Sequence, residues 1–146
     1  MLKGIPAILS PELLKALCEM GHSDRLVIAD GNFPAESIGK SAVVIRLDGH
    51  NVPDVLEAIL KVFPLDTYTD KPVSLMEKVK GDTVETPIWD EFKRIISRHD
   101  DRKEASIGFI ERFKFYEEAK KAYLIIATSE SALYANIMLQ KGVVVD

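Results

Sequence analysis

The sequence lacks a second cysteine, a long apolar run and any block of like charge, and each absence excludes a class of protein. Cys18 is the one cysteine, so no disulfide can form within the chain, and a reducing cytoplasm is expected. Cys18 falls in an apolar helical pattern, which predicts a buried thiol. No apolar run approaches the roughly 18 residues of a membrane span, and the N-terminal residues have no signal-type segment. We therefore expect neither secretion nor membrane insertion.

Charges of both signs alternate along the chain. The 19 Lys and Arg residues are interleaved with 23 acidic residues, and the net charge is -4. This pattern excludes the basic footprint of a nucleic-acid-binding protein. With 146 residues, 47% of them apolar and 29% charged, the chain has the composition of a globular protein, and we expect one domain over residues 1–146.

Several common functional motifs are also missing. No glycine-rich fingerprint opens a helix after a strand, which argues against a dinucleotide site and a P-loop. The three histidines, His22, His50 and His99, share no metal-ligand spacing with one another or with Cys18. No Gly-x-Ser-x-Gly elbow is present. The sequence therefore predicts a site without a metal or a cofactor.

Strand-like and helix-like segments alternate, which predicts a layered α/β fold. The expected strands are Leu26–Ala29, Val43–Leu47, Val73–Val79, Ile107–Ile110, Tyr123–Thr128 and Ile137–Leu139. The expected helices are Pro11–Met20, Pro53–Phe63, Pro87–Arg98 and Phe113–Ala122. The run at 123–128 is apolar and β-branched with little alternation, as expected for a strand buried on both faces. Residues 100–104 are charged and predict a solvated loop.

His22 is the first candidate for chemistry. It follows Gly21 at the end of the first helix, where the helix dipole favours the charged imidazolium, and acidic residues lie within a few positions. These properties suit a group that transfers protons. A histidine that only caps the helix has the same pattern, so both interpretations stay open.

Further candidates lie at the ends of strands and helices, where α/β folds place their sites. Asp30 leaves a buried strand just before Gly31, and its carboxylate either accepts hydrogen bonds from ligand hydroxyls or forms a turn. Tyr134 and Asn136 are two apart, so extended backbone would point both to one side. Arg112 has aromatic neighbours and could equally be an exposed residue at a helix start. On the residues alone, Tyr134 and Asn136 also fit core and turn roles.

These segments together resemble the fucose mutarotase branch of the ribose pyranase and fucose mutarotase family. The order and spacing of the segments carry the resemblance over nearly the whole chain. The matching stretches are Leu2-Lys3-Gly4-Ile5-Pro6, Leu9-Ser10-Pro11-Glu12-Leu13-Leu14, Met20-Gly21-His22, Ala29-Asp30, Asn32-Phe33-Pro34-Ala35, Leu65-Asp66-Thr67-Tyr68, Glu111-Arg112-Phe113, Phe115-Tyr116-Glu117, Lys120-Lys121-Ala122 and Tyr134-Ala135-Asn136.

The resemblance implies roles that the residues alone do not establish. His22 would be the proton donor and acceptor, and Tyr134 a second proton relay. The residues implied around the sugar are Asp30, Asp66, Met76, Arg112, Tyr116, Tyr134, Ala135 and Asn136. Without the resemblance, Asp66 would be a turn residue and Met76 core filling.

The family fold is a three-layer α/β/α arrangement around a mixed sheet. It is assembled into a homo-oligomeric ring, a decamer of two pentamers, with sites between neighbouring subunits. Tyr134 and Asn136 would then complete a site begun by His22 of another chain. No cofactor is implied.

Two positions depart from the family pattern. Ser23 stands where the family often has glycine, and a positive φ there would strain the loop. Ala135 replaces the usual glycine between Tyr134 and Asn136, and its methyl group would narrow the approach of a sugar beside the backbone.

The expected activity is interconversion of the α and β anomers of L-fucose by acid-base ring opening and closure. Ribose pyranase activity, or mutarotation of several monosaccharides, is the alternative within the same fold. A sugar-binding ring without catalysis is the alternative of another class, and a phosphocarrier using His22 is a fourth possibility.

Overall fold

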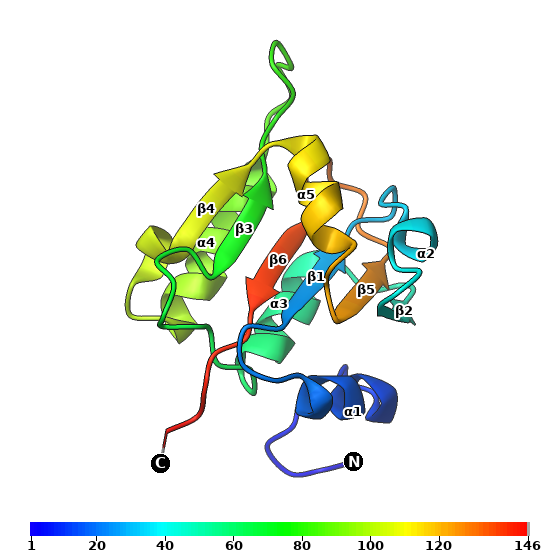
Figure 1. Cartoon of the computed structure of the whole chain (residues 1–146), viewed down its shortest axis with the longest axis vertical. Helices are drawn as coiled ribbons and strands as arrows, with labels where there is room; N and C mark the ends of the chain where they lie inside the picture. The colour runs from blue at the N-terminus through cyan, green and yellow to red at the C-terminus, as the bar shows by residue number, and fades with distance from the viewer. Residues whose placement is uncertain (146) are drawn as a thin grey trace.

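The chain folds into one mixed sheet with helices around it in the computed structural model, which describes residues 1–145 (Figure 1). The sheet has six strands, and one short 3-10 helix, η1, precedes the fourth strand. In chain order the elements are α1 (Pro11–Glu19), β1 (Arg25–Ala29), α2 (Ala35–Ile38), β2 (Val43–Leu47), α3 (Val52–Leu60), β3 (Val73–Met76), α4 (Pro87–His99), η1 (Lys103–Ser106), β4 (Ile107–Ile110), α5 (Arg112–Ala119), β5 (Leu124–Thr128) and β6 (Ile137–Gln140).

The strand order is β2-β5-β1-β6-β3-β4, and β6 is the strand that runs against its neighbours. β1 pairs in parallel with β5 and antiparallel with β6, with Ile28 opposite both Ile126 and Ile137. β3 pairs antiparallel with β6 and in parallel with β4. The end of β6 therefore lies beside the start of β1, and the start of β6 beside the end of β1.

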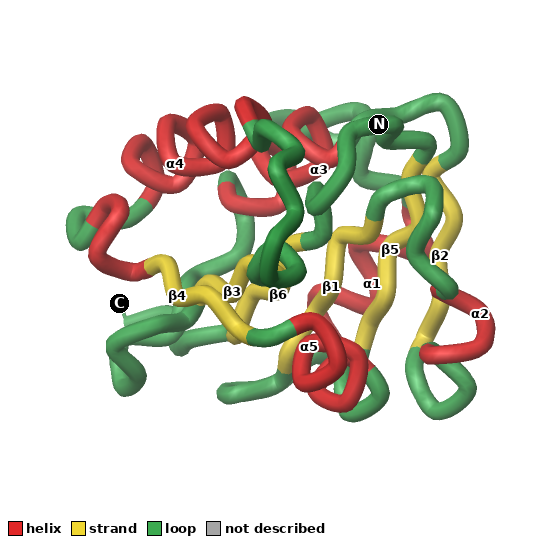
Figure 2. Tube along the Cα trace, turned by 90° about the horizontal axis from the view of Figure 1, so that it is seen from above, coloured by secondary structure: helices red, strands yellow, loops and turns green. Residues whose placement is uncertain are grey.

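Helices cover both faces of the sheet (Figure 2). Helices α3 and α4 pack on one face, and Leu13 and Leu17 of α1 join the same apolar cluster. On the other face Phe115 and Ala119 of α5 pack against Ile125 and other residues of the central strands. The predicted three-layer α/β/α arrangement around a mixed sheet is confirmed.

Local sequence explains the main elements. Ser10 accepts a hydrogen bond from the backbone N–H of Leu13, and Pro11 occupies the first turn, so α1 begins where these residues predict. All five residues of β5 are buried, which agrees with the two-sided burial predicted from its apolar run.

The structure differs from the sequence prediction at several places. β3 ends at Met76 instead of Val79, because its partner β4 ends at Ile110 and the following chain leaves the sheet. The helix α2 was not expected, because Pro34, the residue before it, gives no side-chain capping hydrogen bond that would mark a helix start. The region 100–104 is not simply solvated: Arg102 donates to the backbone carbonyl of Asp66, as well as to Asp100.

Cys18 is exposed, so the prediction of a buried thiol was wrong. The buried stripe of α1 consists of Leu13, Ala16 and Leu17, and position 18 falls beyond its edge. Within residues 1–145, no helix combines the length and the apolar character needed to span a bilayer.

Gly142 lies where the end of β6 meets the segment before β3. Its N–H donates to the carbonyl of Pro64 at 2.8 Å, and the N–H of Asp66 donates to the carbonyl of Gln140 at 3.0 Å. A Cβ atom at position 142 would lie 2.5 Å from the carbonyl oxygen of Leu65. Only glycine allows the two backbone segments to approach this closely.

We expect Gly142→Ala to lower the free energy of unfolding by about 1–3 kcal/mol, because the added methyl group meets backbone atoms that cannot rotate away. Gly21→Ala is the matched control, since its nearest neighbour would be a side-chain oxygen at 3.7 Å. Urea unfolding at equal protein concentrations measures both. Equal stabilities for the two variants would contradict this close-approach argument.

Candidate functional site

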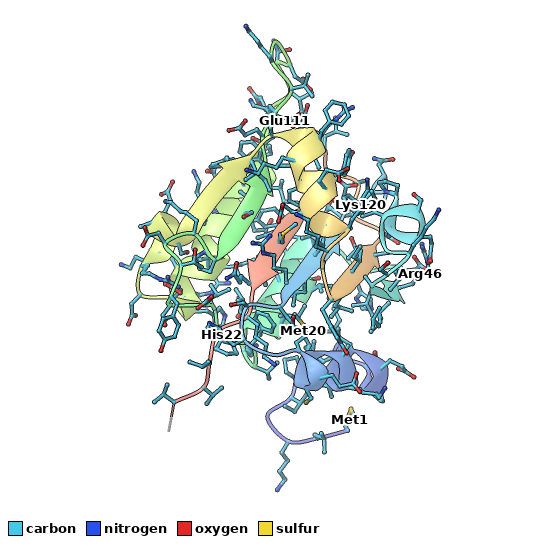
Figure 3. The ribbon with its side chains drawn as sticks, in the orientation of Figure 1. Met1, Met20, His22, Arg46, Glu111 and Lys120 are labelled. Atoms are coloured by element: carbon cyan, nitrogen blue, oxygen red, sulfur yellow. The ribbon has the colours of Figure 1, made fainter. Side chains whose placement is uncertain are left out.

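His22 lies just beyond α1, at the end of the sheet where β1 begins (Figure 3). Its side chain is 42% exposed, and its Nε2 atom is 3.2 Å from Oδ1 of Asp66. The ring of Tyr68 lies 5.3 Å from the imidazole, centroid to centroid. One edge of the imidazole is therefore fixed by a carboxylate, and part of the ring reaches solvent.

Asp66 is buried, with 1% of its surface exposed, and its carboxylate is surrounded by donors. The backbone N–H of Tyr68 donates to Oδ1 at 2.9 Å, and Nε2 of Gln140 donates to Oδ2 at 2.8 Å. Burial acts to raise the pKa of Asp66, but the hydrogen bonds from Tyr68, Gln140 and His22 outweigh it and lower the pKa.

An ionised Asp66 determines which nitrogen of His22 carries a proton. A carboxylate only accepts, so Nε2 of His22 must donate to it. Nδ1 is then the nitrogen left for exchange with another molecule. This arrangement lets His22 work as a proton donor or acceptor with a fixed ring orientation.

The loop that carries His22 is held by Lys141 and contains a strained residue. The N–H of Ser23 donates to the carbonyl of Lys141, and Nζ of Lys141 donates to the carbonyl of Leu17 at 2.7 Å and to that of Met20. Ser23 has a φ of 70°, in the left-handed region. The positive φ anticipated at this position is therefore present, and serine carries a steric cost that glycine would avoid.

A second group of predicted residues lies around a cavity at the opposite end of the sheet. The cavity has a volume of about 310 Å³. Its lining includes six of the predicted sugar-contact residues: Asp30, Met76, Arg112, Tyr116, Tyr134 and Asn136. It also includes Asn32, Phe33, Asp82 and Leu133, for which no sugar contact was predicted.

Asp30 and Asn136 are joined by two hydrogen bonds between β1 and β6. The N–H of Asp30 donates to Oδ1 of Asn136 at 2.8 Å, and Nδ2 of Asn136 donates to Oδ2 of Asp30 at 2.9 Å. Burial raises the pKa of Asp30, in spite of the hydrogen bonds that it accepts from the backbone of Asn32 and Phe33 and from Asn136. The pair presents a rigid polar edge to the cavity.

Tyr134 lines the cavity with a backbone conformation that the sequence did not predict. Its φ is 57°, so the backbone is left-handed and not extended. The indole Nε1 of Trp89 donates to the Tyr134 carbonyl at 2.9 Å and holds this turn. Tyr134 and Asn136 both line this cavity, but the extended backbone expected at Tyr134 is not what places them there.

Arg112, Tyr116 and Met76 complete the cavity wall. Nε of Arg112 is buried and has no hydrogen-bond partner among residues 1–145, and the guanidinium lies 4.8 Å from the centre of the Phe113 ring. Tyr116 packs against Phe33, with ring centres 5.6 Å apart. An unpartnered buried donor is costly, so Nε of Arg112 suits an acceptor oxygen on a bound molecule.

Ala135 does not line the cavity. Its side chain is fully buried in the apolar cluster on the α3 and α4 side of the sheet. The expectation that its methyl group narrows the approach to the site is therefore wrong. The backbone N–H of Ala135 instead contributes a hydrogen bond to Asp30.

The two groups of residues cannot share one small ligand within a single chain. His22 precedes β1 and Asp30 follows it, and β1 has five residues. At about 3.3 Å per residue, the strand separates them by more than the length of a monosaccharide. Figure 3 shows His22 at the lower end of the sheet and Glu111, the neighbour of Arg112, at its upper end.

No group of three or more His, Cys, Asp or Glu side chains within residues 1–145 is arranged to hold a metal ion. Two sets of side chains could bind a molecule or transfer protons. One end of the sheet has the imidazole of His22 bound to a carboxylate, and the cavity at the other end has a carboxylate, an amide, a phenol and a guanidinium. Such groups can bind hydroxyls and exchange protons with them.

Comparison with known proteins gives a consistent result. The model of the RbsD / FucU transport protein family matches residues 3–144. A fucose mutarotase of Homo sapiens is 51% identical over 146 aligned positions, which cover 97% of this chain and 94% of that protein.

Two crystal structures are similar over nearly the whole chain. FucU from Bifidobacterium longum has a TM-score of 0.97 and 67% identity, covering 98% of this chain and 100% of that one. The fucose mutarotase from Streptococcus pneumoniae, in complex with L-fucose, has a TM-score of 0.90 and 46% identity, covering 99% and 100%.

We expect Asp66→Asn to lower the free energy of unfolding near neutral pH by about 1–3 kcal/mol, because the amide keeps one acceptor oxygen where the carboxylate has two. The pKa of Asp66 is lower in the folded chain than its unfolded value of about 3.9, so the ionised group stabilises the fold above that pH. This contribution disappears as the pH falls through the folded pKa. The stability difference between the two proteins should therefore begin to shrink as the pH falls through about 4, and should disappear below the folded pKa.

Urea unfolding at several pH values measures this difference, with the exposed Asp101→Asn as the control. A difference that stays constant over the acidic range would show that Asp66 does not act through its charge.

Proposed function

Since the chain belongs to the RbsD / FucU transport protein family, we propose that it is an L-fucose mutarotase, an isomerase that interconverts the α and β anomers of L-fucose. The observation that carries the proposal is that the predicted residues form two groups at opposite ends of the sheet. One is His22 with Asp66, and the other lines the cavity. The named relatives support L-fucose as the sugar. The exposed, unpaired Cys18 agrees with a reducing cytoplasm as the location.

The active site forms between subunits of a closed homo-oligomeric ring, in which His22 of one subunit faces the cavity of its neighbour. Exposed apolar side chains at both ends support this assembly. Tyr68 is 78% exposed beside His22, and Phe113 and Leu133 are 64% and 50% exposed beside the cavity. Apolar groups next to polar site residues are typical of surfaces that a partner covers. The stacking of two pentamers remains a prediction.

Ring opening requires one proton to reach the ring oxygen and one to leave the anomeric hydroxyl. His22, as imidazolium, gives its Nδ1 proton to the ring oxygen while the bond from that oxygen to the anomeric carbon breaks. The anomeric carbon becomes an aldehyde as its hydroxyl loses a proton. Rotation of the aldehyde and the reverse steps close the ring on the other face. The protons balance without a cofactor.

The cavity residues bind and orient the open and closed forms. Asp30 accepts hydrogen bonds from sugar hydroxyls, and Asn136 exchanges hydrogen bonds with them. Arg112 donates to a sugar oxygen from its unpartnered Nε. Tyr116 and Met76 offer apolar surface to the C–H groups. Asp66 acts on His22 by holding its Nε2. The implied direct contact of Asp66 with the sugar remains a prediction, as does the implied contact of Ala135.

Positioned acid-base catalysis is sufficient for this reaction. It contributes rate factors of ~10² to 10⁴, or about 3 to 5.5 kcal/mol, and mutarotation already proceeds slowly without an enzyme. Comparing catalysed exchange of L-fucose, D-ribose and galactose distinguishes a fucose enzyme from a ribose pyranase or a broader mutarotase. A sugar-binding ring without catalysis would bind a sugar and leave its anomer exchange unchanged.

We expect His22→Ala to reduce the catalysed exchange of L-fucose anomers by about 10²-fold or more, because the group that protonates the ring oxygen is lost. Saturation-transfer NMR on the two anomers measures the exchange rate. His50→Ala is the control, since the His50 side chain belongs to neither end of the site. Unaltered exchange in His22→Ala would remove His22 from the mechanism.

Mixed oligomers test whether the site forms between subunits. His22→Ala and Arg112→Ala should each be nearly inactive alone, since each lacks one half of every site. Refolding equal amounts together should restore about a quarter of the wild-type exchange, because that fraction of interfaces joins an intact His22 to an intact cavity. Activity no greater than the sum of the separate variants would contradict a shared site.

A further inference from the structure

The segment 77–86, between β3 and α4, projects beyond the end of the sheet (Figure 1). Two of its residues turn back to the cavity and contact Tyr134. Asp82 contributes its carboxylate to the cavity wall, beside Tyr134 and Arg112. The family resemblance assigned no role to this segment, and Asp82 is the one charged residue of the cavity lining that still lacks a role.

The hydroxyl of Tyr134 is held on two sides by this segment. It donates to Oδ2 of Asp82 at 2.5 Å and accepts from the backbone N–H of Val79 at 3.2 Å. A phenol has one proton and two lone pairs, so the remaining lone pair is available to a bound molecule. Tyr134 therefore meets a ligand as a hydrogen-bond acceptor while its own proton points to Asp82.

The carboxylate of Asp82 is fixed in this position. The backbone N–H of Val84 donates to Oδ1 at 2.9 Å, and Lys78 closes the segment by donating from Nζ to the carbonyl of Val84 at 3.0 Å. The hydrogen bond from Tyr134 is the largest cause that lowers the pKa of Asp82, followed by the one from Val84. The same contact raises the pKa of Tyr134.

Because the pKa of Tyr134 is raised, a tyrosinate is unfavourable here, and because the pKa of Asp82 is lowered, Asp82 stays ionised near neutral pH. A proton can still pass through Tyr134 if the phenol receives one proton as it gives up another. The phenol then remains neutral throughout, and the charge change falls on Asp82. Hydrogen bonds already aligned in a line of donors and acceptors favour such a transfer.

We propose that Asp82 takes up, through the hydroxyl of Tyr134, the proton that the anomeric hydroxyl loses on ring opening. The inference rests on the proposed mutarotase function and supplies the partner of His22 in that reaction. The O–H bond of the anomeric hydroxyl breaks as its proton forms a bond to Oη of Tyr134. The phenolic proton moves at the same time to Oδ2 of Asp82, and ring closure returns both. Asp82 is thus a positioning and proton-holding residue that acts through Tyr134.

Asp30 is the other carboxylate in the cavity and the rival acceptor. Its Oδ1 accepts from the backbone N–H of Asn32, and its Oδ2 accepts from Asn136. If Asp30 alone received the proton, neutralising Asp82 would leave the exchange rate unchanged. The two assignments therefore differ in a measurable way.

Asp82→Asn tests the charge separately from the shape, since the amide oxygen can still accept from Tyr134. We expect kcat for L-fucose anomer exchange to fall by about 10²-fold with little change in KM, because sugar binding is retained and proton uptake is lost. Asp82→Glu keeps the carboxylate and should retain more of the rate than Asp82→Asn. Glu85→Gln, in the same segment but away from Tyr134, is the matched control and should behave as wild type.

Several outcomes would overturn the relay. Wild-type kcat in Asp82→Asn removes the carboxylate from proton transfer, and an Asp82→Glu rate no better than that of Asp82→Asn does the same. If Asp82→Asn proves less stable in thermal unfolding, the comparison with Asp82→Glu still distinguishes proton uptake by Asp82 from a purely structural role. A wild-type protein that fails to accelerate exchange overturns the proposed function and the relay together, whereas active wild type with unaffected variants overturns the relay alone.

Discussion

The constraint on which the site depends is the buried strand β1, which holds His22 at one end and Asp30 at the other. β1 is paired on both sides, in parallel with β5 and antiparallel with β6, and four of its five residues are buried. It can neither bend nor shift enough to bring the two residues together. The two groups of candidate residues therefore stay apart within one chain, and the proposed function, which needs both, requires a second subunit.

Much of the fold could be predicted because hydrophobic periodicity records which faces are buried. The apolar run that became β5 and the Ser10-Pro11 start of α1 are examples in which local sequence and tertiary structure agree. Cys18 shows the limit of the same reasoning. A helix of nine residues has a narrow buried stripe, and a residue at its edge can lie on either side of the boundary.

The candidate site residues could be named from the resemblance, but the residues that hold them in place could not. Arg102 and Gln140 reach Asp66 from distant segments, and the sequence contains no local signal for either contact. Tyr134 was expected in extended backbone, yet Trp89 and the segment 77–86 hold it in a left-handed turn. Such contacts depend on where separate elements meet, which periodicity does not reveal.

The strand β6 connects both groups of candidate residues, because Asn136, just before its start, binds Asp30, and Gln140, its last residue, binds Asp66. A close-packed strand transmits displacement along its axis instead of absorbing it. Remodelling the cavity for a bulkier sugar by altering β6 would therefore disturb the imidazole support at the far end as well. The ring pair Phe33 and Tyr116, which lies outside that strand, is the better place to reshape the cavity independently.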